Sequence, residues 1–118
     1  MHPLRGNFFE NLVVMEALKY RYNHGKRNNL YFYRDSNGNE IDILYTKGQY
    51  ILPIEIKSGM TITPAYFKSL NKFSSLFPDR LPWSSFLIYC GETEQLRQTT
   101  KVLPIVSLSQ HLDAIDQQ

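Results

Sequence analysis

The sequence predicts an α/β chain of the α+β kind, with one central mixed sheet of four to five strands flanked by helices. Three observations lead to this class: an apolar helical stripe opens the chain, three strand patterns follow with short turns between them, and a second helix leads to a fourth strand. Short turns make neighbouring strands antiparallel, whereas a strand–helix–strand connection makes its two strands parallel, so the sheet is mixed. The expected order is αβββαβ, with a short strand and a helix after it.

Length and composition are those of a single globular domain over residues 1–118. The 118 residues can bury one core, and 42% of them are hydrophobic and 20% charged. No apolar run approaches the roughly 18 residues that span a membrane, and the N-terminus has no apolar signal core, so we expect a cytoplasmic protein without a membrane segment. The lone cysteine, Cys90, ends an apolar run and is expected to be a small buried hydrophobe.

Charge is distributed unevenly along the chain. Residues 1–34 hold six basic and two acidic side chains, so this third carries +4 and the remainder −2 of an overall charge of +2. A basic N-terminal third can be a nucleic-acid-binding face, or a solvated helix surface followed by a basic loop, and the sequence leaves both interpretations open.

The first helix is expected from Asn7, its candidate cap, to Tyr22. An acidic residue, Glu10, lies in the expected first turn, and Gly25 lies beyond the end. Apolar residues recur at helical spacing, and the face expected to pack on the sheet consists of Phe8, Leu12, Met15 and Leu18, with Phe9 and Val13 beside them.

The expected strands begin with Leu30–Arg34, which a turn at 35–39 joins to a hairpin over Glu40–Lys57. The hairpin turn is at 46–49. Four tyrosines in these strands are expected to pack in the sheet rather than stack on nucleobases: Tyr31, Tyr33, Tyr45 and Tyr50.

The second half of the chain is expected to supply a helix and a central strand. Thr63 caps this helix, Pro64 begins it, and it ends near Phe77, with a core stripe of Tyr66, Leu70, Phe73 and Phe77. The nearly continuous apolar run Ser85–Cys90 is typical of a strand covered on both faces. Residues 91–101 have no clear pattern, and a short strand (Val102–Val106) and a terminal helix (Leu108–Ile115) complete the expectation.

Charged residues interrupt the apolar hairpin at Asp42, Glu55 and Lys57. Glu55 and Lys57 are two residues apart in one strand and therefore project from the same face. If the register brings Asp42 near Glu55, two carboxylates and an ammonium converge in otherwise buried strands, where charges need a partner or a metal. The alternatives are an Asp42 that ends a polar turn and a Glu55–Lys57 pair that is exposed at a sheet edge.

The order of these residues resembles the core of the PD-(D/E)XK nucleases, the restriction-endonuclease-like fold. The matching residues are Glu10 on the first helix, Asp42, and the Glu-x-Lys of Glu55 and Lys57. A fuller string looks closer to one group, the domain of unknown function found C-terminal to the ATPase module of many prokaryotic AAA-type ATPases. It comprises Gly6–Glu10, Tyr33–Asp35, Glu40–Ile43 and Pro53–Ser58. The resemblance implies that the chain is the C-terminal part of a longer ATPase.

The resemblance also implies a role for each residue. Asp42, Glu55 and the backbone carbonyl of Ile56 would ligate Mg²⁺ or Mn²⁺, and Glu10 would hold a second ion or a metal-bound water. Lys57 would position the attacking water or help to deprotonate it, and it would stabilise developing charge. The expected substrate is DNA, with Ser58 and Lys68 as candidate phosphate contacts. Without the resemblance, Glu10 in a first turn is explained by the helix dipole alone.

The sequence departs from the family pattern in two places. Ile41 stands where the name-giving proline would precede Asp42, and the second helix lacks the Gln-x-x-x-Tyr of the exonuclease-like branch, so processive cleavage is not expected. No G-x-x-x-x-G-K-[S/T] occurs in the 118 residues, so this chain has no Walker site for ATP.

Two functions follow as hypotheses. The first is a metal-dependent nuclease that acts on DNA, and the second is a catalytically silent nucleic-acid-docking or regulatory module beside an ATPase. They differ in metal binding, which only the first requires. A toxin-like or defence-associated effector is a third hypothesis that the residues neither support nor exclude.

Overall fold

The computed structural model describes residues 3–118, with side chains from Asn7 onward, and the described chain folds around a six-stranded sheet. Its helices are α1 (Pro3–Asn23), α2 (Lys68–Leu76) and α3 (Leu108–Asp116), with short 3-10 helices η1 (Pro64–Phe67), η2 (Pro78–Arg80) and η3 (Ile105–Ser107). Its strands are β1 (Leu30–Arg34), β2 (Glu40–Lys47), β3 (Tyr50–Lys57), β4 (Ser85–Tyr89), β5 (Gln95–Arg97) and β6 (Thr100–Pro104).

The sheet is mixed, as the sequence predicts. Its strand order is β1-β2-β3-β4-β6-β5. The meander β1–β2–β3 is antiparallel, β3, β4 and β6 are parallel, and β5 pairs antiparallel with β6. The expected fold class is therefore confirmed, whereas the expected number of four to five strands is one too low for the described chain.

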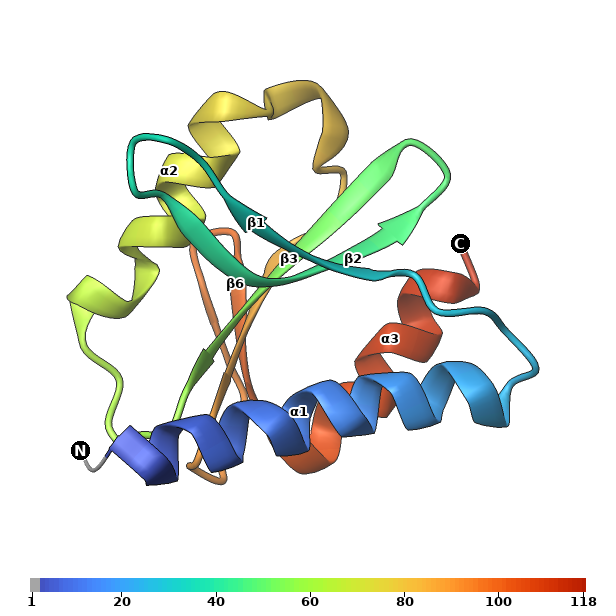
Figure 1. The fold of residues 1–118 in the computed structure, drawn as a ribbon, viewed down its shortest axis with the longest axis horizontal. Coiled ribbons are helices and arrows are strands. Elements are labelled where there is room, and N and C mark those ends of the chain that lie inside the picture. Colours follow the sequence, from blue (N-terminus) through green and yellow to red (C-terminus); the bar gives the residue numbers. More distant parts are fainter. Residues whose placement is uncertain (1–2) are drawn as a thin grey trace.

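Helices cover both faces of this sheet. In Figure 1, α1 and α3 lie together below the sheet, and α2 lies on its other side. The core has two corresponding clusters, one between the sheet and α1 with α3, and a smaller one between the sheet and α2. Every residue of β4 is buried, which confirms the central strand predicted from its apolar run. No helix of the described residues is long and apolar enough to cross a membrane.

Helix α1 packs on the sheet with a different stripe from the one expected. The buried side chains are Phe9, Val13, Ala17 and Tyr20. The exposed side chains include Phe8, Leu12 and Met15, so the prediction that these three face the sheet is wrong. Apolar residues occupy both sides of the helix, and periodicity alone could not select the correct side. The expected cap at Asn7 is also wrong, because α1 begins at Pro3.

A bulge interrupts the pairing of β2 with β1. Tyr31 and Tyr33 are two residues apart in β1, but their partners in β2, Leu44 and Ile41, are three residues apart. Strand β2 therefore contains one extra residue between these pairs, so Ile41 packs with Leu44 in the α2-side core. Asp42 lies within this bulged segment, where the regular alternation of side chains is broken.

The C-terminal end of α3 is held against α1 and β2 by a buried carboxylate. Asp116 accepts hydrogen bonds from the Tyr20 hydroxyl (2.8 Å), the Tyr45 hydroxyl (2.9 Å) and Lys26 Nζ (2.9 Å). Arg21 Nη1 donates to the same oxygen at 3.2 Å. Burial alone would raise the pKa of Asp116, but the hydrogen bonds from Lys26 and the two tyrosines outweigh it and hold that pKa below its usual value.

Candidate functional site

The candidate site lies where β2 and β3 separate. Their backbone ladder ends at the pair Ile43 and Ile54. Beyond it the strands are joined through carboxylates: the Asp42 amide donates to Glu55 Oε1 at 3.1 Å, and the Ile56 amide donates to Asp42 Oδ2 at 2.8 Å. The two predicted acidic residues therefore face each other. Their carboxylates accept hydrogen bonds from the backbone amides that would otherwise pair with backbone carbonyls if the β2–β3 ladder continued.

Both carboxyl groups are in surroundings that disfavour their charged forms. Only 4% of Glu55 is exposed, and Asp42 is half-buried. Burial, followed by the charge of Asp42, raises the pKa of Glu55 to about 8. Burial is also the main cause of the raised pKa of Asp42, although the amide of Ile56 and the charge of Lys57 act against it. The pair therefore retains a proton at neutral pH unless a cation takes its place.

Lys57 is the nearest cation to this pair. Its Nζ lies 3.8 Å from Glu55 Oε2, and a third of its side chain is exposed. The same Nζ lies 5.4 Å from the centre of the Tyr66 ring, a separation at which a cation is attracted to the ring face. Lys57 is therefore held between a carboxylate and an aromatic ring, with part of its side chain open to solvent.

Tyr66 is a residue of the site that the sequence did not reveal, because its helical spacing indicated only a core position. It is half-buried and packs with the α2-side core. Gly59 makes room for it, since a Cβ at this glycine would lie 2.8 Å from the Tyr66 hydroxyl. The glycine two residues after Lys57 was the available signal, but in the sequence it indicated only the end of a strand.

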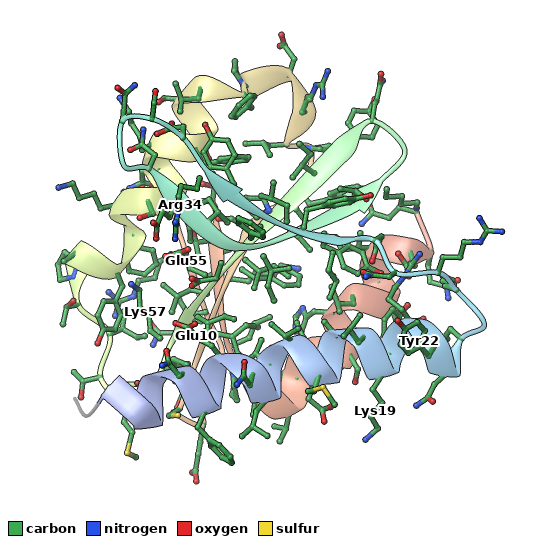
Figure 2. The ribbon with its side chains drawn as sticks, viewed as in Figure 1. Glu10, Lys19, Tyr22, Arg34, Glu55 and Lys57 are labelled. Carbon is green, nitrogen blue, oxygen red and sulfur yellow. The ribbon has the colours of Figure 1, made fainter. Side chains whose placement is uncertain are left out.

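Glu10 faces the site from α1. Figure 2 shows Glu10, Lys57 and Glu55 one above another, between the N-terminal part of α1 and β3. Partial burial and the charge of Asp42 raise the pKa of Glu10, and the charge of Lys57 acts in the opposite direction. Glu10 is thus exposed on α1 within range of the charges of Asp42 and Lys57, but among the described residues it does not complete a group of three acidic metal ligands with Asp42 and Glu55.

The remaining predicted positions are placed as follows. Ile56 has its side chain in the α1-side core, Ser58 is buried at the end of β3, and Lys68 is exposed at the start of α2. Of the four tyrosines expected to pack in the sheet, Tyr45 is fully buried. Tyr31 is 62% exposed, so the expectation is wrong for Tyr31. Tyr33 contacts Phe73 and Phe77, and Tyr50 is partly exposed with its edge on Trp83.

Several cationic side chains of the N-terminal third form ion pairs with carboxylates of the same chain. Arg21 and Lys26 bind Asp116, and Arg34 Nε lies 2.9 Å from Glu40 Oε1. Arg27 is exposed, and no hydrogen bond or ion pair of its side chain occurs among the described residues. Arg21 and Lys26 therefore hold the fold together rather than form a solvated surface or a nucleic-acid-binding face, and Arg27 is the clearest candidate for an external anion.

The donor set fits a small divalent cation with oxygen ligands. Asp42 Oδ1 and Glu55 Oε2 are the carboxylate oxygens that no backbone amide engages in the bonds above. Mg²⁺ and Mn²⁺ prefer such oxygens and use few protein carboxylates, completing their shells with water and substrate phosphate. No group of three or more His, Cys, Asp or Glu side chains within residues 3–118 is arranged as a metal site, so the protein offers this pair rather than a full cage.

The fold and the site define a class: a mixed α/β domain with two facing carboxylates and a lysine at the end of a central strand. The sequence matches a family described as a domain of unknown function, DUF4143, over residues 5–108, so the chain belongs to that family. Comparison with curated proteins and with solved structures gave no significant match. The family description names no activity.

Proposed function

We propose that this domain is a metal-dependent nuclease that hydrolyses DNA phosphodiester bonds, as the C-terminal module of a longer AAA-type ATPase. The observation that carries the proposal is the Asp42–Glu55 pair, which replaces backbone pairing with facing carboxylates beside Lys57. Two poorly solvated carboxylates destabilise a fold unless a cation compensates them, so their presence in the centre of a sheet favours a functional role.

The residues of the site divide the chemistry among them. Asp42 and Glu55 would hold Mg²⁺ or Mn²⁺, with the Ile56 carbonyl as a further oxygen donor and Glu10 on the opposite side. A bound ion would supply charge neutralisation at the phosphate and a lower pKa for a bound water. Lys57 can orient a water molecule or donate to a phosphate oxygen, and the Tyr66 ring keeps its ammonium near Glu55.

A second candidate is a catalytically silent nucleic-acid-docking or regulatory module of the ATPase. Two observations favour it: the carboxylates already have partners within the chain, and the net charge of +2 gives only a weak attraction to DNA. In this alternative the hydrogen bonds of Asp42 and Glu55 hold β2 and β3 together, and the two residues act on no substrate.

A cleavage assay separates the two functions. Supercoiled plasmid and single-stranded DNA are incubated with Mg²⁺, with Mn²⁺ or with EDTA, and the wild type is compared with Glu55→Gln and Lys57→Met. We expect metal-dependent cleavage that falls at least about 100-fold in both variants, as when a group that stabilises transition-state charge is removed. Glu40→Gln is the matched control, because Glu40 is an exposed carboxylate at the start of the same hairpin. Activity that is absent, or that survives in both site variants, contradicts the nuclease function.

The attachment to an ATPase has its own test. This chain contains no Walker sequence, so we expect no ATP hydrolysis from it alone. The full-length polypeptide purified from its natural source should hydrolyse ATP and react with an antibody raised against this domain. A full-length polypeptide no larger than this domain would contradict the attachment.

A further inference from the structure

We propose that the side of α1 that faces away from the sheet pairs with α1 of a second copy of this chain, with the two helices antiparallel. The side chains of this surface, which we call the outer stripe, are Phe8, Leu12, Met15, Lys19 and Tyr22. The inference goes beyond the proposed nuclease function and does not depend on it.

The outer stripe is apolar and open to solvent. Its exposed fractions are 67% for Phe8, 43% for Leu12, 63% for Met15 and 60% for Tyr22. The fully buried Val13 and Ala17 lie on the opposite side of the helix, against the sheet. Lys19 lies between Met15 and Tyr22, and its apolar stem continues the stripe. Exposed apolar side chains that follow one another along a helix in this way indicate a surface that another molecule covers.

The spacing of the outer stripe indicates that its partner is a helix. Successive members are four, three, four and three residues apart, which is the spacing of the core positions in a coiled coil. The stripe extends about 21 Å along the helix axis, so the partner helix must be of similar length. Among the helices of residues 3–118, α1 has 21 residues, whereas α2 and α3 have nine each. A second α1 therefore matches the stripe in both length and spacing, and pairing with it is two-fold symmetric.

Lys19 determines the orientation of the pair. Figure 2 shows Lys19 extending from α1 on the side away from the sheet, and 66% of its side chain is exposed. In a parallel pair, the two Lys19 ammonium groups would face each other and repel. In an antiparallel pair, Leu12 packs on Met15 of the second copy, and Lys19 lies against the ring of Phe8 of the second copy, which attracts a cation.

The position of α1 leaves this surface accessible to a second copy. Figure 1 shows α1 at the outer boundary of the molecule. Glu10 faces Glu55 and Lys57 from the other side of α1, so pairing through the outer stripe leaves the candidate site open (Figure 2).

The area of the outer stripe predicts weak association. Its exposed fractions correspond to about 400 Å² of apolar surface in each copy. Roughly 800 Å² of apolar surface in the pair, with a polar rim around it, is near the lower end of specific interfaces. We therefore expect a Kd of about 10–100 μM, so that the chain is monomeric in dilute solution.

Sedimentation equilibrium of the complete chain, from about 1 μM to about 500 μM, measures this association. We expect monomers at the lowest concentration and mainly dimers at the highest. Met15→Glu should abolish the dimer, because it places a carboxylate from each copy in the apolar centre of the pair. Leu96→Glu is the matched control, since Leu96 is similarly exposed (65%) but lies on β5. Circular dichroism checks that both variants are folded.

A variant that strengthens the pair gives a second measurement. Lys19→Leu should lower the Kd at least about tenfold, because it makes the outer stripe continuously apolar. A lysine on a surface without a partner would leave the oligomeric state unchanged by this substitution.

Disulfide formation tests the orientation. Phe8→Cys and Lys19→Cys are prepared separately in a Cys90→Ala chain, because Cys90 is a free cysteine, and the two proteins are mixed and oxidised. An antiparallel pair joins position 8 of one copy to position 19 of the other. A parallel pair joins identical positions only, since the two positions are about 16 Å apart along the helix.

Three results would overturn the proposal. The first is a chain that stays monomeric at the highest concentration, which would assign the outer stripe to a different protein segment. The second is an equal effect of Met15→Glu and Leu96→Glu on the Kd. The third is a set of disulfides that join only identical positions.

Discussion

At the scale of single residues, Glu55 is where stability and the proposed function conflict. It is buried, it faces Asp42, and its main cation, Lys57, is 3.8 Å away. A buried acid with a raised pKa is destabilising above its unfolded-state pKa of 4.5, and the penalty grows until the folded-state value near 8 is reached. At pH 7 the metal-free protein therefore folds with Glu55 largely protonated, and the cost of this proton uptake lowers its stability.

The first prediction follows from this conflict. In EDTA at pH 7, Glu55→Gln should increase the free energy of unfolding by about 1 kcal/mol, because the side-chain amide oxygen can still accept from the Asp42 backbone amide while the cost of protonating residue 55 on folding is lost. Adding Mn²⁺ at about ten times its Kd should stabilise the wild type by roughly 1.4 kcal/mol and leave the variant unchanged. Urea unfolding with and without metal measures both effects. A variant that is less stable than the wild type in EDTA, and equally stabilised by Mn²⁺, would contradict the argument.

The second prediction concerns Tyr66, whose ring lies beside the Lys57 ammonium. We expect Tyr66→Phe to leave the cleavage rate nearly unchanged, since the ring face is retained, and Tyr66→Leu to reduce it about two- to fivefold, as for an exposed cation–π contact of about 0.5–1 kcal/mol. The KM for DNA should change little, because the tyrosine acts through the lysine. Equal losses in the two variants would show that the hydroxyl, and not the ring, matters.

At the scale of elements, the side chains of α1 differ in how much they contribute to packing on the sheet. Val13 is fully buried against the sheet, whereas Met15, two residues later, is exposed. We expect Val13→Ala to lower the free energy of unfolding by about 2 kcal/mol and Met15→Ala by less than about 0.5 kcal/mol. Chemical denaturation of the two variants measures the difference. Similar losses would mean that the outer side of α1 is covered in solution.

The elements also show how far the sequence determines the fold. Long periodic segments such as α1 and β4 were predictable, because an apolar run or a helical stripe has few alternative structures. The buried side of α1 was not predictable, because apolar residues lie on both of its sides and only contact with the sheet decides between them. β5 was missed because three residues cannot show an alternation, and its turn uses Gln98 at φ 54° rather than a glycine.

Most residues of the site could be predicted from the sequence, but their arrangement in space could not. Glu55 and Lys57 share a face because they are two apart in a strand, which the sequence shows directly. The approach of Asp42 depends on the bulge in β2, and a one-residue insertion relative to a partner strand is a property of the pairing rather than of either segment. Tyr66 reaches Lys57 across the loop after β3, and that long-range contact has no local pattern.

At the scale of the whole molecule, the C-terminal helix α3 is held against the C-terminal end of α1 and against β2 through Asp116. Its side chain is almost fully buried and receives bonds from α1, the following loop and β2. Lys47 reinforces the same corner by donating to the Ile115 carbonyl at 3.0 Å. Helix α3 thereby covers, together with α1, the same face of the sheet (Figure 1). Loss of these hydrogen bonds should lower global stability while leaving the hydrogen bonds between Asp42 and the Glu55–Ile56 segment in place.

The last prediction tests the hydrogen bonds of Asp116 through their dependence on pH. At pH 7, Asp116→Asn should lower the free energy of unfolding by about 2–3 kcal/mol, because charge-assisted bonds are lost and the two cations lose their counter-charge. The pKa of Asp116 is depressed in the folded state, so its contribution is fully present above the unfolded-state value of about 4 and is lost as the pH falls through the folded-state value. The wild type and the variant should therefore differ most at neutral pH and converge toward pH 2. Urea unfolding at several pH values measures the difference, with Asp79→Asn, an exposed position in η2, as the control. A difference that stays constant down to pH 2 would show that the shape of the side chain, and not its charge, holds α3 against α1 and β2.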